Sequence, residues 1–289
     1  MHRQEAMNQA IPGPVVITGA SGQVGRALIA ELQRCGIRSQ ALVRKPAGLS
    51  HCEEYCDWME SSEAEAVLAS AATVVHLAGN LKPAQGDYTS ANVKTTERVA
   101  QSVAPTCCRR LVFLSFHGAS TSSTNPYLAS KALAENILLS AGVPTTILRC
   151  CHIVGSPSHP GPTASSLIAG SSGVVQVLGS GSQRWAPVAL QDVVAAIVAA
   201  LAGEHDGLFH LQGPEVMQLD ELITVLNPGK RLLRLHIPAP LAHLLRFTGL
   251  PDALIEVMLS DCFSESGGEA TQAPAILGIT PTSVRHQWI

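Results

Sequence analysis

The 289-residue chain is 46% hydrophobic and 14% charged, and its formal net charge is −3 at pH 7. This composition indicates a folded globular protein, and the absence of a basic stripe with interleaved aromatic residues argues against a nucleic-acid partner. No apolar run reaches the roughly 18 residues that a membrane span requires, and the longest, Val193 to Ala202, fits a buried helix. Residues 1–13 lack the apolar core of a secretion signal, so we expect a short N-terminal extension on a cytoplasmic protein.

Strand-like apolar runs alternate with helical patterns through the first half of the chain. We predict strands over 14–18, 38–43, 52–56, 73–78, 109–115 and 144–149, and helices over 23–35, 62–71, 90–104 and 126–141. The alternation predicts an α/β fold with a doubly wound, Rossmann-like parallel sheet in a nucleotide-binding domain of residues 14–151. Residues 152–289 are expected to form a small α/β substrate-side region that also contributes elements to the main domain.

A glycine-rich turn follows the first strand. The segment from Val15 to Gly25 reads VVITGASGQVG, so that its glycines have the spacing G-x-x-G-x-x-G. Glycine lets the backbone approach a phosphate closely, and the N-terminus of the next helix presents unpaired N–H groups to an anion. We therefore expect the phosphates of a dinucleotide to lie against Gly19, Ala20, Ser21, Gly22, Gln23, Val24 and Gly25.

The residues after the second strand indicate which dinucleotide binds. An NAD site usually has a carboxylate here that bonds the ribose 2′-hydroxyl. This chain has Arg44 and Lys45 instead, and a planar guanidinium suits a 2′-phosphate. We predict NADP rather than NAD, the alternative being that both cations only solvate a surface loop.

Tyr127 and Lys131 form the candidate catalytic pair. Asn125 and Pro126 predict a helix start, which places the two side chains four residues apart on one helix face. A nearby ammonium favours the phenolate and lowers the pKa of a tyrosine, so the pair predicts a general acid or base. Ser115 ends the preceding strand and is expected to hydrogen-bond a substrate carbonyl or hydroxyl. An ordinary solvated Tyr–Lys pair is the alternative.

These motifs, TGASGQVG, VVHLAG and LS…YLASK, together resemble the short-chain dehydrogenase/reductase superfamily in its atypical and extended branches, over about residues 15–230. The resemblance implies that Tyr127 is the general acid/base, that Lys131 also holds the nicotinamide ribose and that Ser115 orients the reacting oxygen. It further implies that Asn92 lies near the site, although Thr95 replaces the glycine of the family's N-x-x-G-T helix. On the adenosine side it implies contacts from Asp57, Trp58, Leu77, Ala78 and Gly79.

The C-terminal segment EVMLSDCFSES…ILGITPTSV is similar to the tails of bacterial relatives of the nucleotide-binding accessory subunit of respiratory complex I. In the mitochondrial subunit the nucleotide is structural and the catalytic residues have degenerated. The similarity therefore implies association with a respiratory complex. Retention of Tyr127 and Lys131 in this chain favours activity instead.

Three functions follow from these observations. The favoured one is an NADP-dependent oxidoreductase that transfers hydride to or from a small carbonyl or alcohol substrate. The others are a catalytically silent NAD(P)-binding regulator or respiratory-complex accessory protein, and a nucleotide-sugar epimerase or dehydratase with bound NAD, which the missing acidic residue disfavours.

Several residues outside these motifs also carry expectations. Arg184 and Trp185 are expected to reach the substrate pocket, the Gly-, Ser- and Pro-rich stretch 155–183 to lie over the cleft, and Asp192 to be a helix N-cap. His51, Cys52 and Cys56 resemble metal ligands but have no second matching pair, so we expect no metal site. Pairing into a homodimer through sheet-face helices would be consistent with the family resemblance.

Overall fold

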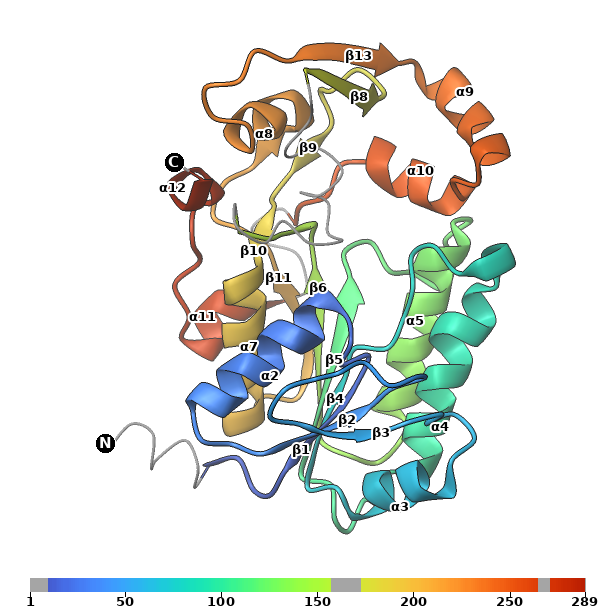
Figure 1. Ribbon diagram of the computed structural model, residues 1–289, viewed down its shortest axis with the longest axis vertical. Coiled ribbons are helices and arrows are strands. Elements are labelled where there is room, and N and C mark those ends of the chain that lie inside the picture. The colour runs from blue at the N-terminus through green and yellow to red at the C-terminus, as the bar shows by residue number, and fades with distance from the viewer. Residues whose placement is uncertain (1–9, 157–172, 265–270, 289) are drawn as a thin grey trace.

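The computed structural model describes residues 10–156, 173–264 and 271–288. Its centre is an eight-stranded sheet of order β14-β11-β6-β5-β4-β1-β2-β3, in which every neighbouring pair is parallel (Figure 1). The strands are β1 (Val15–Thr18), β2 (Ser39–Leu42), β3 (Glu53–Tyr55), β4 (Thr73–His76), β5 (Arg110–Phe116), β6 (Thr145–Cys150), β11 (Gly207–Leu211) and β14 (Thr271–Gln272). The order of the strands reverses between β1 and β4, where ligands of such sheets bind.

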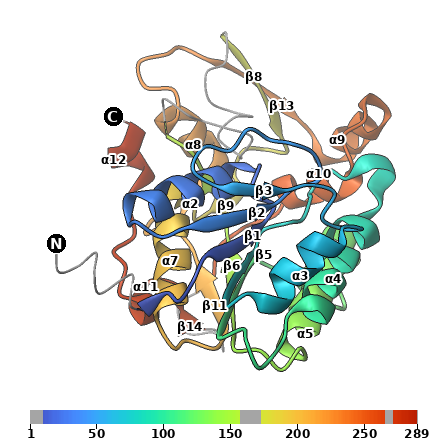
Figure 2. The ribbon, with the colours of Figure 1, turned by 60° about the horizontal axis from the view of Figure 1, so that its bottom comes forward.

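Helices cover both faces of this sheet (Figure 2). One face carries α2 (Gln23–Arg34), α7 (Leu190–Ala202) and α11 (Ala273–Leu277), and the other carries α3 (Ser62–Ser70), α4 (Thr95–Ser102) and α5 (Pro126–Leu139). Because successive side chains of a strand point to opposite faces, Val15 and Ile17 enter the core under α2 while Val16 enters the core under α3. The predicted doubly wound, Rossmann-like α/β fold is confirmed.

The elements predicted for the first half are present, with ends that differ by at most two residues. One of them departs from regular geometry. The helix predicted over 90–104 begins as a π-helical turn, η2 (Thr89–Lys94), and only then continues as α4. Such turns are frequent at functional sites, and this one carries Asn92.

The second half of the chain completes the main sheet with α7, β11, β14 and α11, and it also builds a separate region beyond the carboxyl ends of the strands (Figure 1). Because residues after 151 contribute both to the main sheet and to this separate region, the domain boundary expected at residue 151 stays a prediction. We call residues 173–187 and 212–264 the cap. Its elements are β8 (Val174–Leu178), β9 (Arg184–Trp185), β12 (Met217–Gln218), α8 (Leu219–Val225), β13 (Leu233–Ile237), α9 (Ala239–Ala242), η3 (His243–Thr248) and α10 (Asp252–Leu259). The remaining elements are η1 (Ala84–Gly86), β7 (Ile153–Val154), which pairs with β10 (Val188–Ala189), and α12 (Val284–Trp288).

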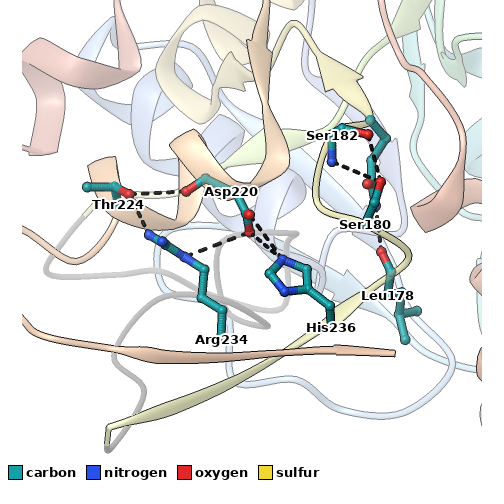
Figure 3. Close-up of polar contacts among 8 residues, drawn as sticks. Leu178, Ser180, Ser182, Asp220, Thr224, Arg234 and His236 are labelled. Atoms are coloured by element: carbon teal, nitrogen blue, oxygen red, sulfur yellow. Dashed lines mark hydrogen bonds and ion pairs between the residues drawn. The ribbon is translucent and has the colours of Figure 1, made fainter. Parts of the chain in front are cut away.

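An acidic residue fastens the strands of the cap to its first helix. Figure 3 shows Asp220, in the first turn of α8, between two side chains of β13. Its carboxylate lies 3.0 Å from Nε2 of His236 and 3.7 Å from Nε of Arg234. Gly181 packs directly against this carboxylate, since a Cβ at that position would lie 2.5 Å from the carboxyl carbon. The cap thus depends on side chains that are distant in sequence.

Asp192 does not cap α7, contrary to the sequence-based prediction. The N-cap residue is Ala189, and Asp192 lies in the first turn of the helix. Its carboxylate accepts hydrogen bonds from the backbone N–H of Thr282 at 2.6 Å and from the Thr282 hydroxyl at 2.8 Å. Asp192 therefore has a structural role of another kind, because it ties a C-terminal segment to α7.

The described residues include neither a helix that could span a membrane nor a cluster of metal ligands. None of the helices in residues 10–156, 173–264 and 271–288 is long and apolar enough to cross a membrane. Over the same residues there is no group of three or more His, Cys, Asp or Glu side chains that could hold a metal ion.

Candidate functional site

The turn between β1 and α2 requires two of its glycines for steric reasons. Gly19 has φ +68°, and a Cβ there would lie 2.6 Å from the backbone nitrogen of Ala78. A Cβ on Gly25 would lie 2.5 Å from the carbonyl oxygen of Ala20. Gly22 is the N-cap of α2 and adds no side chain at that end of the helix. The turn therefore leaves the N-terminus of α2 open at the carboxyl edge of the sheet.

A cavity of about 320 Å³ joins this turn to the predicted catalytic residues. On the nucleotide side its lining includes Gly19, Gly22, Gln23, Val24, Gly25, Leu77 and Gly79. The rest of the lining comprises Asn80, Leu81, Asn92, Leu114, Ser115, Phe116, Tyr127, Lys131, Cys150, Cys151, His152 and Ile153. Four predicted residues thus share one cavity with the glycine turn. They come from three elements: Ser115 from β5, Asn92 from η2, and Tyr127 and Lys131 from α5.

Tyr127 is covered by the cap. Its side chain is only 9% exposed, meets the rings of Tyr88 and Phe116 edge-on, and packs in one cluster with Ala253 and Val257 of α10. This burial raises the pKa of Tyr127 above its usual value, because the phenolate would lose its water. The expectation of a lowered tyrosine pKa is therefore wrong for this arrangement.

Lys131 is equally buried and has its own partners. The ammonium Nζ donates a hydrogen bond to the carbonyl oxygen of Leu114 at 2.7 Å and lies 4.1 Å from the centroid of the Phe113 ring. Burial lowers the pKa of Lys131 to about 8, so the side chain is mostly charged at neutral pH. Desolvation is the largest influence on the pKa of each side chain, and neither is among the charged groups that shift the pKa of the other.

Ser115 has a protein partner for its hydroxyl hydrogen. The hydroxyl donates to Oε1 of Glu135 at 2.5 Å, and Glu135 in turn accepts two hydrogen bonds from Arg149, at 2.9 and 2.6 Å. To donate to a substrate carbonyl, the Ser115 hydroxyl would have to rotate away from Glu135. Its oxygen lone pairs can accept a hydrogen bond without that change.

Asn92 connects the turn after β4 to α5. Its side-chain oxygen accepts from the backbone N–H of Asn80 at 2.8 Å, and its amide nitrogen donates to the hydroxyl of Ser130 at 2.8 Å. A Cβ on Gly79 would lie 2.9 Å from this oxygen, so Gly79 allows the close approach. The geometry fits a residue that positions the site.

His76 stabilises the position of Asn92 through Thr96. The sequence analysis did not assign His76 a role. Thr96 donates its hydroxyl hydrogen to the carbonyl of Asn92, so Nε2 of His76 must donate to Thr96, at 2.9 Å. Nδ1 then accepts from the hydroxyl of Thr18 at 2.7 Å. Burial lowers the pKa of His76 to about 3, which keeps the ring in this neutral form. The available signal was a histidine at the end of the apolar strand TVVH.

The predicted cations of the cofactor site lie at the end of β2. Arg44 and Lys45 are exposed, and neither forms a hydrogen bond or ion pair with another described residue. Arg26, which the sequence analysis did not single out, donates to the carbonyl of Ser21 at 3.0 Å and to that of Ala47 at 3.1 Å. Its guanidinium thereby bridges the glycine turn and the loop that follows β2.

The adenosine-side residues predicted after β3 have unequal access. Asp57 is exposed and has φ +52°, at the turn where β3 ends. Trp58 is 2% exposed, and its indole packs in the core with Leu42 and Leu68. The carboxylate of Asp57 is available to a nucleotide, whereas the indole of Trp58 is not.

Arg184 and Trp185 do not line this cavity, contrary to expectation. As neighbours in β9 they point to opposite sides. Arg184 pairs with Asp261 through its Nε and Nη2 atoms, at 3.1 and 2.9 Å, beside a separate, more open cavity of about 650 Å³ in the cap that also contacts Ser180 and His236. Trp185 is fully buried and donates its indole N–H to the carbonyl of Ser260 at 3.0 Å. Most of the stretch expected over the cleft, residues 157–172, lies outside the described residues.

Comparison with known proteins gives a family for most of the chain. The model of the NAD dependent epimerase/dehydratase family matches residues 15–210. A curated relative is the NADH dehydrogenase [ubiquinone] 1 alpha subcomplex subunit 9, mitochondrial, of Arabidopsis thaliana, which is 28% identical over 228 residues. That match covers 73% of this chain and 56% of the plant protein, so the chain spans little more than half the length of that relative.

Solved structures share the same fold. MoeE5 in complex with UDP-glucuronic acid and NAD has a TM-score of 0.74 at 22% identity, with 96% of each chain covered. The UDP-glucuronic acid 4-epimerase from Bacillus cereus in complex with UDP-glucuronic acid and NAD has a TM-score of 0.69 at 15% identity, with 95% of this chain and 96% of that chain covered. Identities this low support the fold alone.

Proposed function

The chain belongs to the NAD-dependent epimerase/dehydratase family, and from that premise we propose that it is a reductase that uses NADPH to reduce a small, uncharged carbonyl compound. The observation that carries the proposal is the single cavity shared by the glycine turn, Ser115, Tyr127 and Lys131. Nucleotide and acid/base residues that meet in one space are the minimum arrangement for hydride transfer coupled to proton transfer.

The preference for NADPH rests on charge at the end of β2. Arg44 and Lys45 have no described partner, and Arg26 holds the neighbouring loop through Ala47. The nearby carboxylate of Glu54 accepts the backbone N–H groups of Ala47, at 2.7 Å, and of Leu49. These donors lower its pKa and engage it within the protein, so Glu54 does not offer the free carboxylate of an NAD site.

The proposed mechanism assigns the proton to Tyr127. Bound nicotinamide supplies the hydride. The neutral hydroxyl of Tyr127 holds a proton at physiological pH, because burial raises its pKa, and it donates that proton to the substrate oxygen as negative charge develops there. An alkoxide is a stronger base than a phenolate, so the transfer is favourable in the direction of reduction. Ala253 and Val257 of α10 exclude water around the donor.

The electrostatics of the cavity support an uncharged substrate. Among its described lining residues, Lys131 is the one side chain with a formal charge at neutral pH, and its Nζ atom already donates to Leu114. A nucleotide-sugar carries two phosphates, which need cationic or N–H partners. The epimerase or dehydratase alternative is therefore less well supported than reduction of a small molecule.

A catalytically silent accessory protein of a respiratory complex is the second candidate. It is favoured by the 28% identity to the plant complex I subunit. Under this proposal the same cavity holds a nucleotide for structural reasons, and the side chain of Tyr127 meets no substrate.

One experiment separates the two candidates. Oxidation of NADPH is followed with a panel of aldehydes and ketones, for the wild type and for Tyr127→Phe. Reductase function predicts turnover that falls by about 10²- to 10⁴-fold in the variant, the usual contribution of a general acid, while NADPH affinity stays within about twofold. Tight NADPH binding without turnover of any carbonyl compound would favour the accessory protein.

A further inference from the structure

The cap has an exposed apolar face that takes no part in the proposed function. It is formed by β8, β13, α9 and η3, which continues α9. These strands and α9 lie at one end of the long axis of the molecule (Figure 1). The large apolar side chains of this face, which we call the apolar tip, are 53–77% exposed: Val174, Leu233, Leu235, Leu241, Leu244 and Phe247. An apolar surface of this kind on a folded domain marks an interaction site.

The side chains of β13 are arranged in the reverse of the order that water on the outer face would favour. Leu233 is in register with Val174 of the parallel strand β8, so both residues lie on one face of the pair. Arg234 and His236 reach the other face, where they contact Asp220 of α8. The strand thus turns its charges inward and its leucines outward. A sheet with one solvated face has polar side chains on that face, so this pattern indicates an apolar environment outside β13.

The segment after β13 continues the apolar tip. η3 has 3₁₀ geometry, in which side chains three residues apart lie on the same side. Leu244 and Phe247 have this spacing, and Leu241 of α9 lies three residues before Leu244. The three side chains therefore form one apolar row. A short helical segment with Leu and Phe on one side is typical of proteins that lie in the interface of a membrane.

The apolar tip is accompanied by positive charge. Residues 222–251 contain four Lys or Arg residues and no Asp or Glu, although the whole chain has a net charge of −3. Lys230 and Arg231 precede β13, are exposed and form no ion pair with another described residue. Arg246, between the side chains of the apolar row, lies 3.9 Å from the carboxylate of Asp252. Cations beside exposed Leu and Phe side chains complement an anionic lipid surface.

This charge also decides between possible partners. A symmetric contact with a second copy of the chain would bring Lys230, Arg231 and Arg246 toward the same cations of the other copy, which is unfavourable. Lipid phosphates would compensate these charges, and the acyl chains would receive the leucines and Phe247. We propose that the apolar tip docks on a membrane surface that contains anionic phospholipids. The inference does not depend on the proposed function.

Sedimentation with vesicles tests the inference. The full-length protein is mixed with vesicles of phosphatidylcholine alone, or of phosphatidylcholine with about 30% phosphatidylglycerol, in low and in high salt. We expect binding to the anionic vesicles at low salt to be about 20-fold or more stronger than binding to the neutral ones. We expect high salt to weaken it, because salt screens the attraction between the cations and the lipid phosphates.

A charge variant tests the contribution of the cations. Lys230→Gln with Arg231→Gln should weaken binding to the anionic vesicles by about 20-fold, since each cation near such a surface contributes about fivefold. Arg38→Gln with Arg109→Gln is the matched control. It removes the same charge at exposed positions beside the amino ends of β2 and β5, and it should bind like the wild type.

An apolar variant tests the insertion of side chains. Leu244→Ser with Phe247→Ser should weaken binding by about tenfold or more, because the apolar surface that enters the lipid is lost. Leu139→Ser is its control, since Leu139 is 49% exposed at the carboxyl end of α5 and outside the apolar tip, and it should leave binding unchanged. Circular dichroism verifies that every variant is folded.

Three results would overturn the inference. These are no preference of the wild type for anionic vesicles at low salt, binding that neither double variant weakens, and a lipid-free dimer that Leu244→Ser with Phe247→Ser dissociates. The last result would assign the apolar tip to a second copy of the chain. Reduction of carbonyl compounds is not a readout of this experiment, so failure of the reductase proposal is a separate outcome.

Discussion

The nucleotide-binding half, residues 10–151, and the cap differ in how their structure is specified. In the first half, strands of three to seven residues alternate with helices, and most side chains of β1, β2, β4, β5 and β6 are buried. In the cap, strands β9 and β12 have two residues each, and large apolar side chains such as Leu233 and Phe247 are 69% and 77% exposed. The structure of the nucleotide-binding half is thus set mainly by local backbone geometry. The structure of the cap depends on contacts between segments that are far apart in the sequence.

Asn125 lies where the two regions meet. It makes both local hydrogen bonds, within its own helix, and hydrogen bonds to a segment that is distant in sequence. Its side-chain oxygen caps α5 by accepting from the backbone N–H groups of Tyr127 and Leu128, at 3.0 and 3.3 Å. Its amide nitrogen donates to the carbonyl of Ala253 at 3.0 Å and to Glu256 at 2.7 Å, both in α10. The cap is therefore attached at the start of α5, the helix that carries the proposed catalytic pair.

The largest effect is expected where local backbone geometry is strictest. Gly19→Ala places a Cβ 2.6 Å from backbone atoms at a residue with φ +68°. We expect overpacking and left-handed strain together to lower the free energy of unfolding by about 4 kcal/mol. We also expect the variant to lose nucleotide binding. Gly48→Ala is the matched control. Its φ is +61° with no atom within 4 Å of the new Cβ, so only the strain of about 1–2 kcal/mol remains. Equal losses in urea unfolding would contradict the steric argument.

The next effect concerns the buried histidines at the carboxyl edge of the sheet. Burial lowers the pKa values of His76 and His152 to about 3 and that of His117 to about 4. The unfolded chain binds protons near pH 6.5 and the folded chain does not, so this stability is fully present above pH 6.5 and is lost as the pH falls. From these three histidines we expect a decrease of about 4 kcal/mol between pH 7.5 and 5.5.

Urea titrations across this pH range give the slope of stability against pH. His117→Phe should reduce the slope, since it removes one of the histidines that take up protons on unfolding, while His76, His152 and His210, whose pKa values burial also lowers, remain. Stability that does not change between pH 7.5 and 5.5 would show that these histidines are not buried as neutral rings.

A smaller effect is expected at the attachment of the cap. Asn125→Ala removes the α5 cap and both bonds to α10, and should cost about 2 kcal/mol. Ser61→Ala removes a single capping bond at α3, to Ala64, and should cost about 1 kcal/mol. Proteolysis should separate the two variants further, with cleavage in α10 promoted only by Asn125→Ala. Identical cleavage patterns would argue that the cap is attached elsewhere.

The smallest effect is expected for the cofactor preference. Arg44→Ala should weaken NADPH binding by about tenfold through loss of one charged hydrogen bond, and should leave NADH binding almost unchanged. Arg109→Ala offers a control that alters the same net charge at an exposed position away from β2. Equal or tighter binding of NADH than NADPH by the wild type would disprove the preference.

Much of the structure of the nucleotide-binding half was predictable because its elements are determined by residues that are close together in the sequence. Residue alternation predicts the strands, steric need predicts the glycines of the turn, and the four-residue spacing of Tyr127 and Lys131 predicts a shared helix face. Since parallel strands end at one edge of the sheet, Ser115 could also be assigned to the same site, whereas Asn92 was assigned to it through the family resemblance. The structure brings all four residues to one cavity.

The remainder depends on segments that lie far away in the sequence. The sequence by itself determined the sheet, the phosphate-binding turn and the pairing of Tyr127 with Lys131, because each depends on residues a few positions apart. Only the tertiary structure decided that α10 buries Tyr127 and raises its pKa, that Asp192 binds Thr282, and that Trp185 and Phe116 pack against His152. Burial and desolvation arise from all the atoms around a group, and those atoms come together only when the chain has folded.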